Sequence, residues 1–156
     1  MKMKFNELTK ERPVYLLPDG FYNAKIATAE LKQGTERPYI NLRLDVFDDE
    51  GKRLSGIFDV ISEVPEKKDG MTDEEINKID TLSNKLYNFL MATEISVPEE
   101  FELKDILDNI SQAKEFKVQI STRRQGGYPP RNIVNINQGG YFSLTEVIDE
   151  EEADAI

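Results

Sequence analysis

The clearest pattern along the chain is a strict alternation of apolar and polar residues in YINLRLDVF, residues 39–47. Successive side chains of a strand point to opposite faces, so this alternation predicts a strand with one buried face. The residues predicted to face the core are Ile40, Leu42, Leu44 and Val46. The opposite face carries Tyr39, Asn41, Arg43, Asp45 and Phe47. One face of this strand therefore presents aromatic, amide and cationic groups.

Two further strands are predicted on either side of this one. Residues 20–32 follow a PDG turn signal and mix β-branched, aromatic and polar residues, which is typical of a strand. Residues 52–61, KRLSGIFDVI, follow the turn sequence DDEG, and Gly56 within them predicts a bulge or a bend.

The apolar period then changes from two to that of a helix. Thr72 and Glu75 have the spacing of a capping box, and apolar residues recur at helical intervals through residue 92. A shorter helix is expected near residues 103–111. Two strands follow, EFKVQISTR and RNIVNINQ, joined by a Gly/Pro loop. In the first of them Phe116, Val118 and Ile120 are predicted to face the core.

This order predicts a mainly β fold with some α-helix: a five-stranded, OB-fold-like antiparallel barrel with a helical insertion between strands three and four. An α+β sandwich would give the same order of elements. We expect one OB-fold-like domain over residues 1–140 and a flexible acidic tail over residues 141–156.

Composition narrows the chemistry. The 156 residues include no cysteine and no histidine, which removes thiol catalysis, disulfides, Cys/His zinc sites and Ser-His-Asp triads. No nucleotide-binding glycine motif or EF-hand loop occurs. We therefore expect no catalytic residue, no cofactor and no metal. The alternative is a magnesium-dependent nuclease that uses Asp45, Asp48, Asp49 or Asp59, although DDEG between two apolar runs is typical of a turn.

No apolar run reaches the roughly 20 residues that cross a bilayer, so we expect no membrane partner. The first residues, MKMKFNELTK, lack the apolar stretch of a signal peptide. The expected location is the cytoplasm. The oligomeric state stays open, a homo-oligomer included.

The formal net charge of −10 is unevenly distributed. Residues 1–61 are neutral overall, residues 62–113 carry −8 and residues 141–156 carry −6. Residues 114–140 carry +4. Salt screens exposed charges beyond roughly 8 to 10 Å, so a ligand responds to the local charge and an anion can bind this basic segment.

The basic segment contains the loop sequence STRRQGGYPPRN, residues 121–132. Arg123, Arg124 and Arg131 supply guanidinium groups for phosphates, and Tyr128 supplies a ring on which a base can stack. The polar faces of neighbouring strands add Lys117, Arg43, Tyr39 and Phe47. Such a surface suits single-stranded nucleic acid with weak sequence preference. A simpler interpretation is a solvated turn whose cations pair with acidic helices.

Two interpretations concern the acidic segments. The −8 helical segment is compatible with an acidic mimic of DNA, or an assembly protein, that binds a host enzyme. The acidic end, LTEVIDEEEADAI, suggests a tail that occupies the basic surface until DNA displaces it and that then binds partner proteins.

The run LPDGFYNAKIATAELKQGTERPYINLRLDVFDDEGKRLSGIFDVIS, the central helix, the Arg/Gly hairpin and the acidic end together resemble bacteriophage single-stranded DNA-binding proteins of the OB-fold type. The resemblance implies a role in DNA replication, recombination and repair in the host cytoplasm. It also implies that the tail recruits polymerase, primase or helicase. The tail residues so assigned are Asp149, Glu150, Glu151, Glu152, Asp154 and Ile156. The chain departs from this family in having no tryptophan and in ending in Ile156 rather than phenylalanine.

Overall fold

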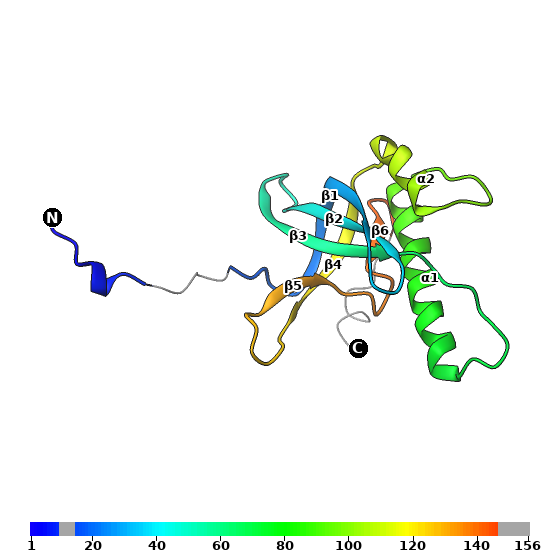
Figure 1. Ribbon diagram of the computed structural model, residues 1–156. Coiled ribbons are helices and arrows are strands. Elements are labelled where there is room, and N and C mark those ends of the chain that lie inside the picture. The colour runs from blue at the N-terminus through cyan, green and yellow to red at the C-terminus, as the bar shows by residue number, and fades with distance from the viewer. Residues whose placement is uncertain (10–14, 147–156) are drawn as a thin grey trace.

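The computed structural model describes residues 1–9 and 15–146 as a mainly β structure with one long helix (Figure 1). The strands are β1 (Gly20–Gln33), β2 (Pro38–Phe47), β3 (Arg53–Ser62), β4 (Phe116–Arg123), β5 (Arg131–Val134) and β6 (Tyr141–Ser143). The helices are α1 (Asp73–Thr93) and α2 (Leu103–Asp108), with two short 3-10 helices, η1 (Phe5–Glu7) and η2 (Ile110–Gln112). The prediction of five strands is wrong by one, because β6 was missed.

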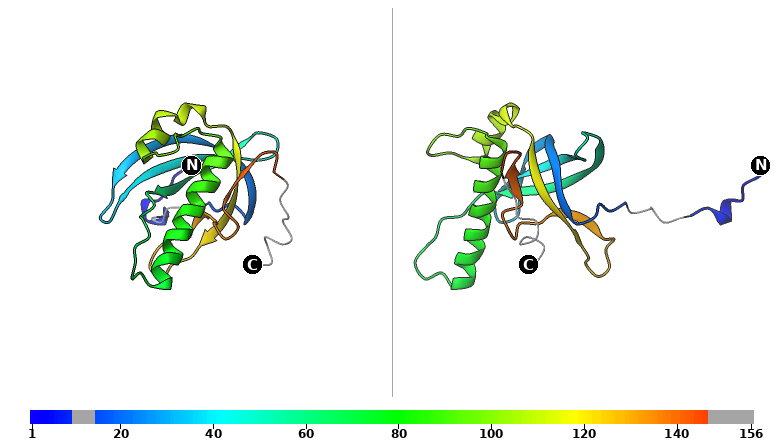
Figure 2. Two further views of the ribbon diagram at one scale, coloured as in Figure 1. Left: turned by 90° about the vertical axis from the view of Figure 1, so that its right-hand side faces the viewer. Right: turned by 180° about the vertical axis from the view of Figure 1, so that it is seen from behind.

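All six strands belong to one antiparallel sheet with the order β3-β2-β1-β4-β5, and β6 pairs with β4 on the edge opposite β1. Strand β1 pairs with two neighbours: residues 20–24 pair with β4 and residues 23–33 pair with β2. A register shift at Ala27 interrupts the β1–β2 ladder, and the sheet curves strongly (Figure 2). Strands β3 and β5 are the first and last in this order, and the curvature of the sheet brings them close together. No ladder of hydrogen bonds joins these two strands. The sheet is therefore open along that seam.

The predicted alternation of β2 is confirmed. Its four inward-facing residues are fully buried, and so are the predicted inward-facing residues of β4. Helix α1 packs against β6, β3 and β4 and brings Phe89 into the core. The Phe89 and Tyr141 rings meet edge to face at 5.3 Å, and the Phe116 ring lies 5.6 Å from Tyr141. An aromatic cluster thus joins the helix to the sheet.

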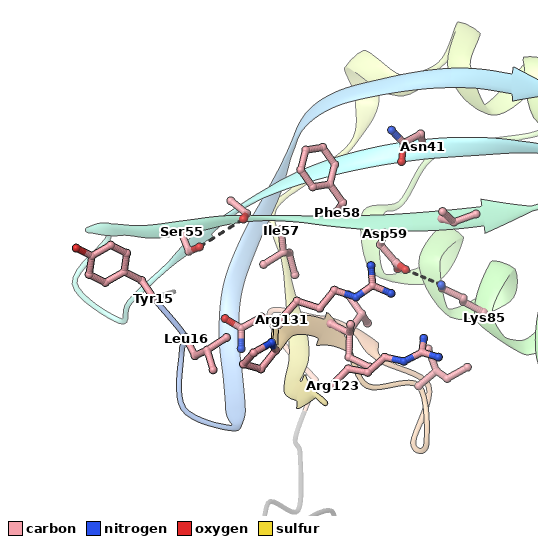
Figure 3. A pocket seen from close by; sticks show the side chains of 17 residues that line it. Tyr15, Leu16, Asn41, Ser55, Ile57, Phe58, Asp59, Lys85, Arg123 and Arg131 are labelled. Carbon is pink, nitrogen blue, oxygen red and sulfur yellow. Dashed lines mark hydrogen bonds and ion pairs between the residues drawn. The ribbon is translucent and has the colours of Figure 1, made fainter. Parts of the chain in front are cut away.

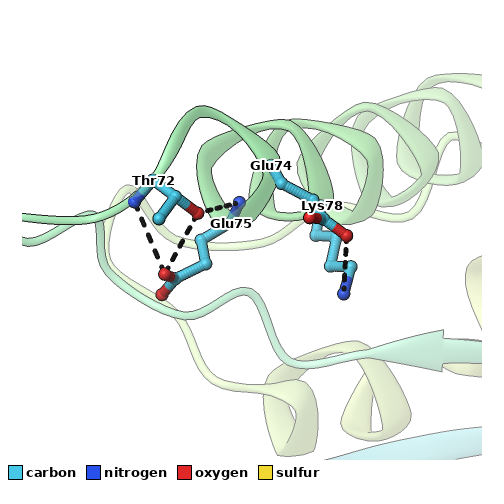
Figure 4. A network of polar contacts seen from close by, with 4 residues as sticks. All are labelled: Thr72, Glu74, Glu75 and Lys78. Carbon is cyan, nitrogen blue, oxygen red and sulfur yellow. Dashed lines mark hydrogen bonds and ion pairs between the residues drawn. The ribbon is translucent and has the colours of Figure 1, made fainter.

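The predicted start of α1 is confirmed by its hydrogen bonds (Figure 4). Thr72 Oγ1 accepts from the backbone N–H of Glu75 at 3.2 Å, and Glu75 Oε1 accepts from the backbone N–H of Thr72 at 3.4 Å. The second predicted helix is shorter than expected, because α2 ends at Asp108 and η2 follows it. Among the described residues, no helix is both long enough and apolar enough to span a bilayer.

The predicted domain boundary after residue 140 is wrong, because β6 belongs to the fold. Gly139 and Gly140 have φ values of 104° and 77°, a conformation that glycine adopts without strain. A Cβ on Gly140 would also lie 2.8 Å from Val134 Cγ1. This close turn brings the chain back to β4, where Tyr141 and Phe142 are 2% and 8% exposed.

The bulge predicted at Gly56 lies close by instead. Gly56 pairs regularly with Asp45 of β2, whereas the register shifts where Val46 pairs with Ser55 and Phe47 with Arg53. Leu54 is therefore the extra residue, and Gly56 keeps a regular strand pairing.

Candidate nucleic-acid interface

A groove of about 700 Å³ runs between β3 and the β4–β5 hairpin, along the seam where the sheet is open. Figure 3 shows its two walls. Strand β3 supplies one wall, and the hairpin supplies Arg123 and Arg131 to the other. The segment before β1 adds Tyr15 and Leu16 at one end.

The two arginines are neighbours because of the hairpin register, which places Arg123 opposite Arg131. Figure 3 shows both side chains extending in the same direction, below β3. Both residues are exposed, and no ion pair within residues 1–9 and 15–146 includes either of them. The alternative interpretation, a solvated turn whose cations pair with the acidic helices, required ion pairs to these two arginines. The described residues form no such pair with them.

The base of the hairpin is held by residues that precede β1. Asn132 Oδ1 accepts from Leu17 N–H at 2.9 Å, and Asn132 Nδ2 donates to Leu17 O at 3.1 Å. Asp19 Oδ1 accepts from Thr122 N–H at 3.1 Å. These contacts span more than 100 residues of sequence, so they fix the arginines relative to β1.

The hairpin tip carries the other two predicted loop residues. Tyr128 is exposed and lines a second hollow of about 470 Å³ together with Pro129, Arg123 and Arg131. Arg124 is also exposed but lines neither hollow. The structure therefore brings Tyr128 close to the arginine pair and leaves Arg124 beside it.

The β3 wall contains an exposed aromatic ring that the sequence analysis missed. Phe58 is 65% exposed and lies on the outer face of the sheet, with its register partner Arg43 beside it on β2. Val60, also exposed, lies opposite Asn41. A signal for Phe58 was present, because it is out of phase with the inward-facing Ile57 and Ile61.

A partly buried polar network closes the other end of the groove. Lys85 Nζ of α1 donates to Asp59 Oδ1 at 2.7 Å, and the Tyr141 hydroxyl donates to Asp59 Oδ2. The side chains of Lys85 and Asp59 are 16% and 12% exposed. Burial, followed by the nearby Asp59 carboxylate, raises the pKa of Tyr141 well above its usual value. The tyrosine therefore stays a proton donor to Asp59.

Besides the residues of the hairpin tip, four predicted site residues do not line the groove: Arg43, Phe47, Tyr39 and Lys117. Phe47 has Lys25 Nζ 5.1 Å above its ring, and Tyr39 lies against Gly34 in the β1–β2 turn. Lys117 is paired with Asn23 on one side and Phe142 on the other, six residues along β4 from Arg123. At about 3.3 Å per residue, that separation is close to 20 Å.

The predicted polar face of β4 is also partly covered. Gln119 shares this face with Lys117 and is buried, because β6 and the turn before it pack alongside β4. The polar face of β4 is therefore not continuously exposed between Lys117 and Arg123.

The acidic residues weighed as a nuclease site do not gather. Asp45 pairs with Arg53 at 3.0 Å, and Asp59 pairs with Lys85. Asp48 Oδ1 accepts from the N–H groups of Glu50 and Lys52, which is the predicted turn. Asp49 is exposed in that turn. No cluster of three or more potential metal-ligating side chains occurs in the part of the chain that the structure describes.

Of the two acidic segments, the structure describes the helical one but not the chain end. On the helical side, lysines pair with carboxylates: Lys67 with Asp80, Lys78 with Glu74, and Lys114 with Glu94. The predicted tail residues Asp149, Glu150, Glu151, Glu152, Asp154 and Ile156 lie outside the described residues.

Comparison with known proteins adds no assignment. No protein-family model matches this chain. No curated protein matches it either.

Proposed function

We infer that this protein binds single-stranded DNA without strong sequence preference, and without catalysis, along the groove between β3 and the β4–β5 hairpin. The observation that carries this proposal is the pairing of Arg123 with Arg131 on one wall of a groove whose other wall, β3, bears the exposed Phe58. Guanidinium groups bind phosphates, and an exposed ring offers a stacking surface to any base.

The topology supports the same proposal. The sheet order, the helix α1 between β3 and β4, and the approach of β3 to β5 are features of a five-stranded, partly open OB-fold barrel. Strands two and three of that fold, with the loop between strands four and five, form its oligonucleotide-binding surface. We propose this fold here, with β6 as an addition.

The acidic end completes the proposal at the level of partners. Residues 147–156 contain five carboxylate side chains and no cation. In the proposed mechanism they compete with DNA for the basic hairpin and, once displaced, recruit replication proteins such as a polymerase, a primase or a helicase. The protein then acts in phage DNA replication, recombination or repair.

The first test is a double variant, Arg123→Ala with Arg131→Ala. The matched control, Lys78→Ala with Lys104→Ala, removes the same charge from the helical segment. Fluorescence anisotropy with labelled oligo(dT) should show a loss of affinity of about a hundredfold for the arginine variant, since each of the two lost charge-assisted phosphate contacts is worth about 1.4 kcal/mol. Equal weakening in both variants would show that only total charge matters and would reject the groove.

A further inference from the structure

Two guanidinium groups converge over Gly56 on the outer face of β3. A Cβ on Gly56 would lie 3.0 Å from Arg53 Nη2 and 3.3 Å from Arg43 Nε. Gly56 has an ordinary strand pairing with Asp45, and it is not among the glycines with positive φ. The absence of a side chain is therefore needed for space, not for backbone conformation: it leaves room for both arginine side chains.

The charge around this point favours an anion. The carboxylate of Asp45 pairs with Arg53 Nε at 3.0 Å. Arg43 belongs to no ion pair among the described residues and is exposed. Lys25, the register neighbour of Asp45 on β1, adds a third cation. These three cations and one carboxylate leave a positive excess beside two guanidinium groups that lie over the same residue, Gly56.

An exposed aromatic ring adjoins the two arginines. Phe58 is the register partner of Arg43, and opposite residues on one face of an antiparallel pair have Cβ atoms about 4.5 to 5.5 Å apart. A phosphate held between the guanidinium groups thus places the attached nucleoside within reach of the Phe58 ring. Apolar packing does not explain this ring, because it is 65% exposed.

We propose that Arg43 and Arg53 bind the phosphate of one nucleotide over Gly56 while its base stacks on Phe58. The ligand class is a nucleoside monophosphate unit, either free or as one unit of a strand. This inference rests on the proposed function in placing that unit within the bound single strand, at the β3 wall of the groove. It adds a defined nucleotide subsite on the outer face of the sheet.

The key variant is Gly56→Ala. The atoms that its Cβ would meet are the ends of flexible arginine side chains, so the fold should persist while both guanidinium groups are displaced. An unchanged thermal midpoint checks the fold. The control Arg37→Ala removes an arginine that pairs with Glu36 in the β1–β2 turn. Phe58→Ala removes the stacking ring alone.

Titration of ¹⁵N-labelled protein with dTMP, thymidine or inorganic phosphate locates the subsite. The amides around Gly56 and Phe58 should shift and saturate with dTMP, shift less with phosphate, and stay unchanged with thymidine. Gly56→Ala and Phe58→Ala should each weaken dTMP binding about tenfold, and Arg37→Ala should not. Shifts that are spread over the surface without saturation, or that are equal in Gly56→Ala, would overturn the proposal.

Oligo(dT) separates this inference from the proposed function and tells a strand from a free nucleotide. Weaker oligo(dT) binding by Gly56→Ala, in line with dTMP, supports a subsite within the strand. If the unmodified protein binds oligo(dT) and Gly56→Ala binds it equally well, the subsite is wrong while the groove stands. If the unmodified protein binds no oligo(dT), the proposed function itself fails.

Discussion

Asp59 is the residue at which the sheet, helix α1 and strand β6 meet. Its carboxylate accepts from Lys85 of α1 and from the hydroxyl of Tyr141 of β6. All three side chains are largely removed from water. The hydrogen bonds among them therefore offset the cost of removing their polar groups from water. The network holds the helix against the end of the groove and engages both carboxylate oxygens of Asp59.

Tyr141→Phe tests this network. The substitution leaves the ring in place and removes one hydrogen bond to a carboxylate, so the free energy of unfolding should fall by about 1.5 to 3 kcal/mol. Urea titration at pH 7 measures that loss. Since Asp59 keeps its pairing with Lys85, the variant should still fold. A free energy of unfolding equal to that of the unmodified protein would show that the hydroxyl contributes nothing.

The same variant should change the alkaline behaviour. The pKa of Tyr141 is raised in the folded state, whereas in the unfolded chain it is near 10, so the folded state binds the proton more tightly. This contribution is present below pH 10 and is lost as the pH rises above it. Tyr141→Phe should therefore lose less stability above pH 10 than the unmodified protein. Some decline remains, because Tyr22 also has a raised pKa.

The residue scale also shows what the sequence could predict. Strict alternation located the buried residues of β2 and β4, because burial of one face imposes a period of two. The hairpin arginines were found from local charge. Phe58 was missed because an apolar residue in an apolar strand resembles a core residue. The convergence of Arg43 and Arg53 over Gly56 could not be predicted, because it depends on the register between β2 and β3.

At the scale of elements, helix α1 owes its start to a local signal. Thr72→Ala removes the acceptor for the Glu75 N–H and should cost about 1 kcal/mol of stability, measured by urea unfolding. Thr81→Ala is the matched control. Its hydroxyl bonds back to Asn77 O within the helix, and alanine has the higher helix propensity there. If both variants have the same stability, the capping box does not stabilise α1.

Strand β6 shows the limit of local signals. Three residues are too short for a periodic pattern, and they follow two glycines and precede an acidic run. Their place is set by long-range contacts, namely pairing with β4 and the ring contacts of Tyr141 with Phe89 and Phe116. The charge pattern placed the start of the acidic tail at residue 141, but residues 141–143 form β6 and belong to the sheet.

Truncation separates these two parts of the chain end. A chain of residues 1–146 keeps β6 and should match the full chain in thermal midpoint. A chain of residues 1–140 loses Tyr141 from the core and should be destabilised by about 3 to 5 kcal/mol or fail to fold. Circular dichroism melting distinguishes them.

Removal of residues 147–156 alone should also raise the affinity for oligo(dT) at low salt, because the five carboxylates no longer compete with DNA for the hairpin arginines. Unchanged affinity would reject the competing tail.

At the scale of the whole molecule, a chain of net charge −10 is proposed to bind a polyanion. The structure makes this consistent by separating the charges: lysines and carboxylates pair on the helical side, whereas the hairpin arginines line the groove on the open seam of the sheet. At physiological salt, screening weakens the repulsion between the carboxylates of the helical side and a phosphate bound in the groove. Binding must then come from local phosphate contacts, which leave a characteristic salt dependence.

The most direct test is therefore the affinity of the full chain for oligo(dT) measured over a series of salt concentrations. The account predicts that the logarithm of the binding constant falls linearly with the logarithm of salt. It further predicts that Arg123→Ala with Arg131→Ala lowers that slope by about 0.7 for each lost phosphate contact. Undetectable binding at low salt, or an affinity independent of salt, would contradict the account.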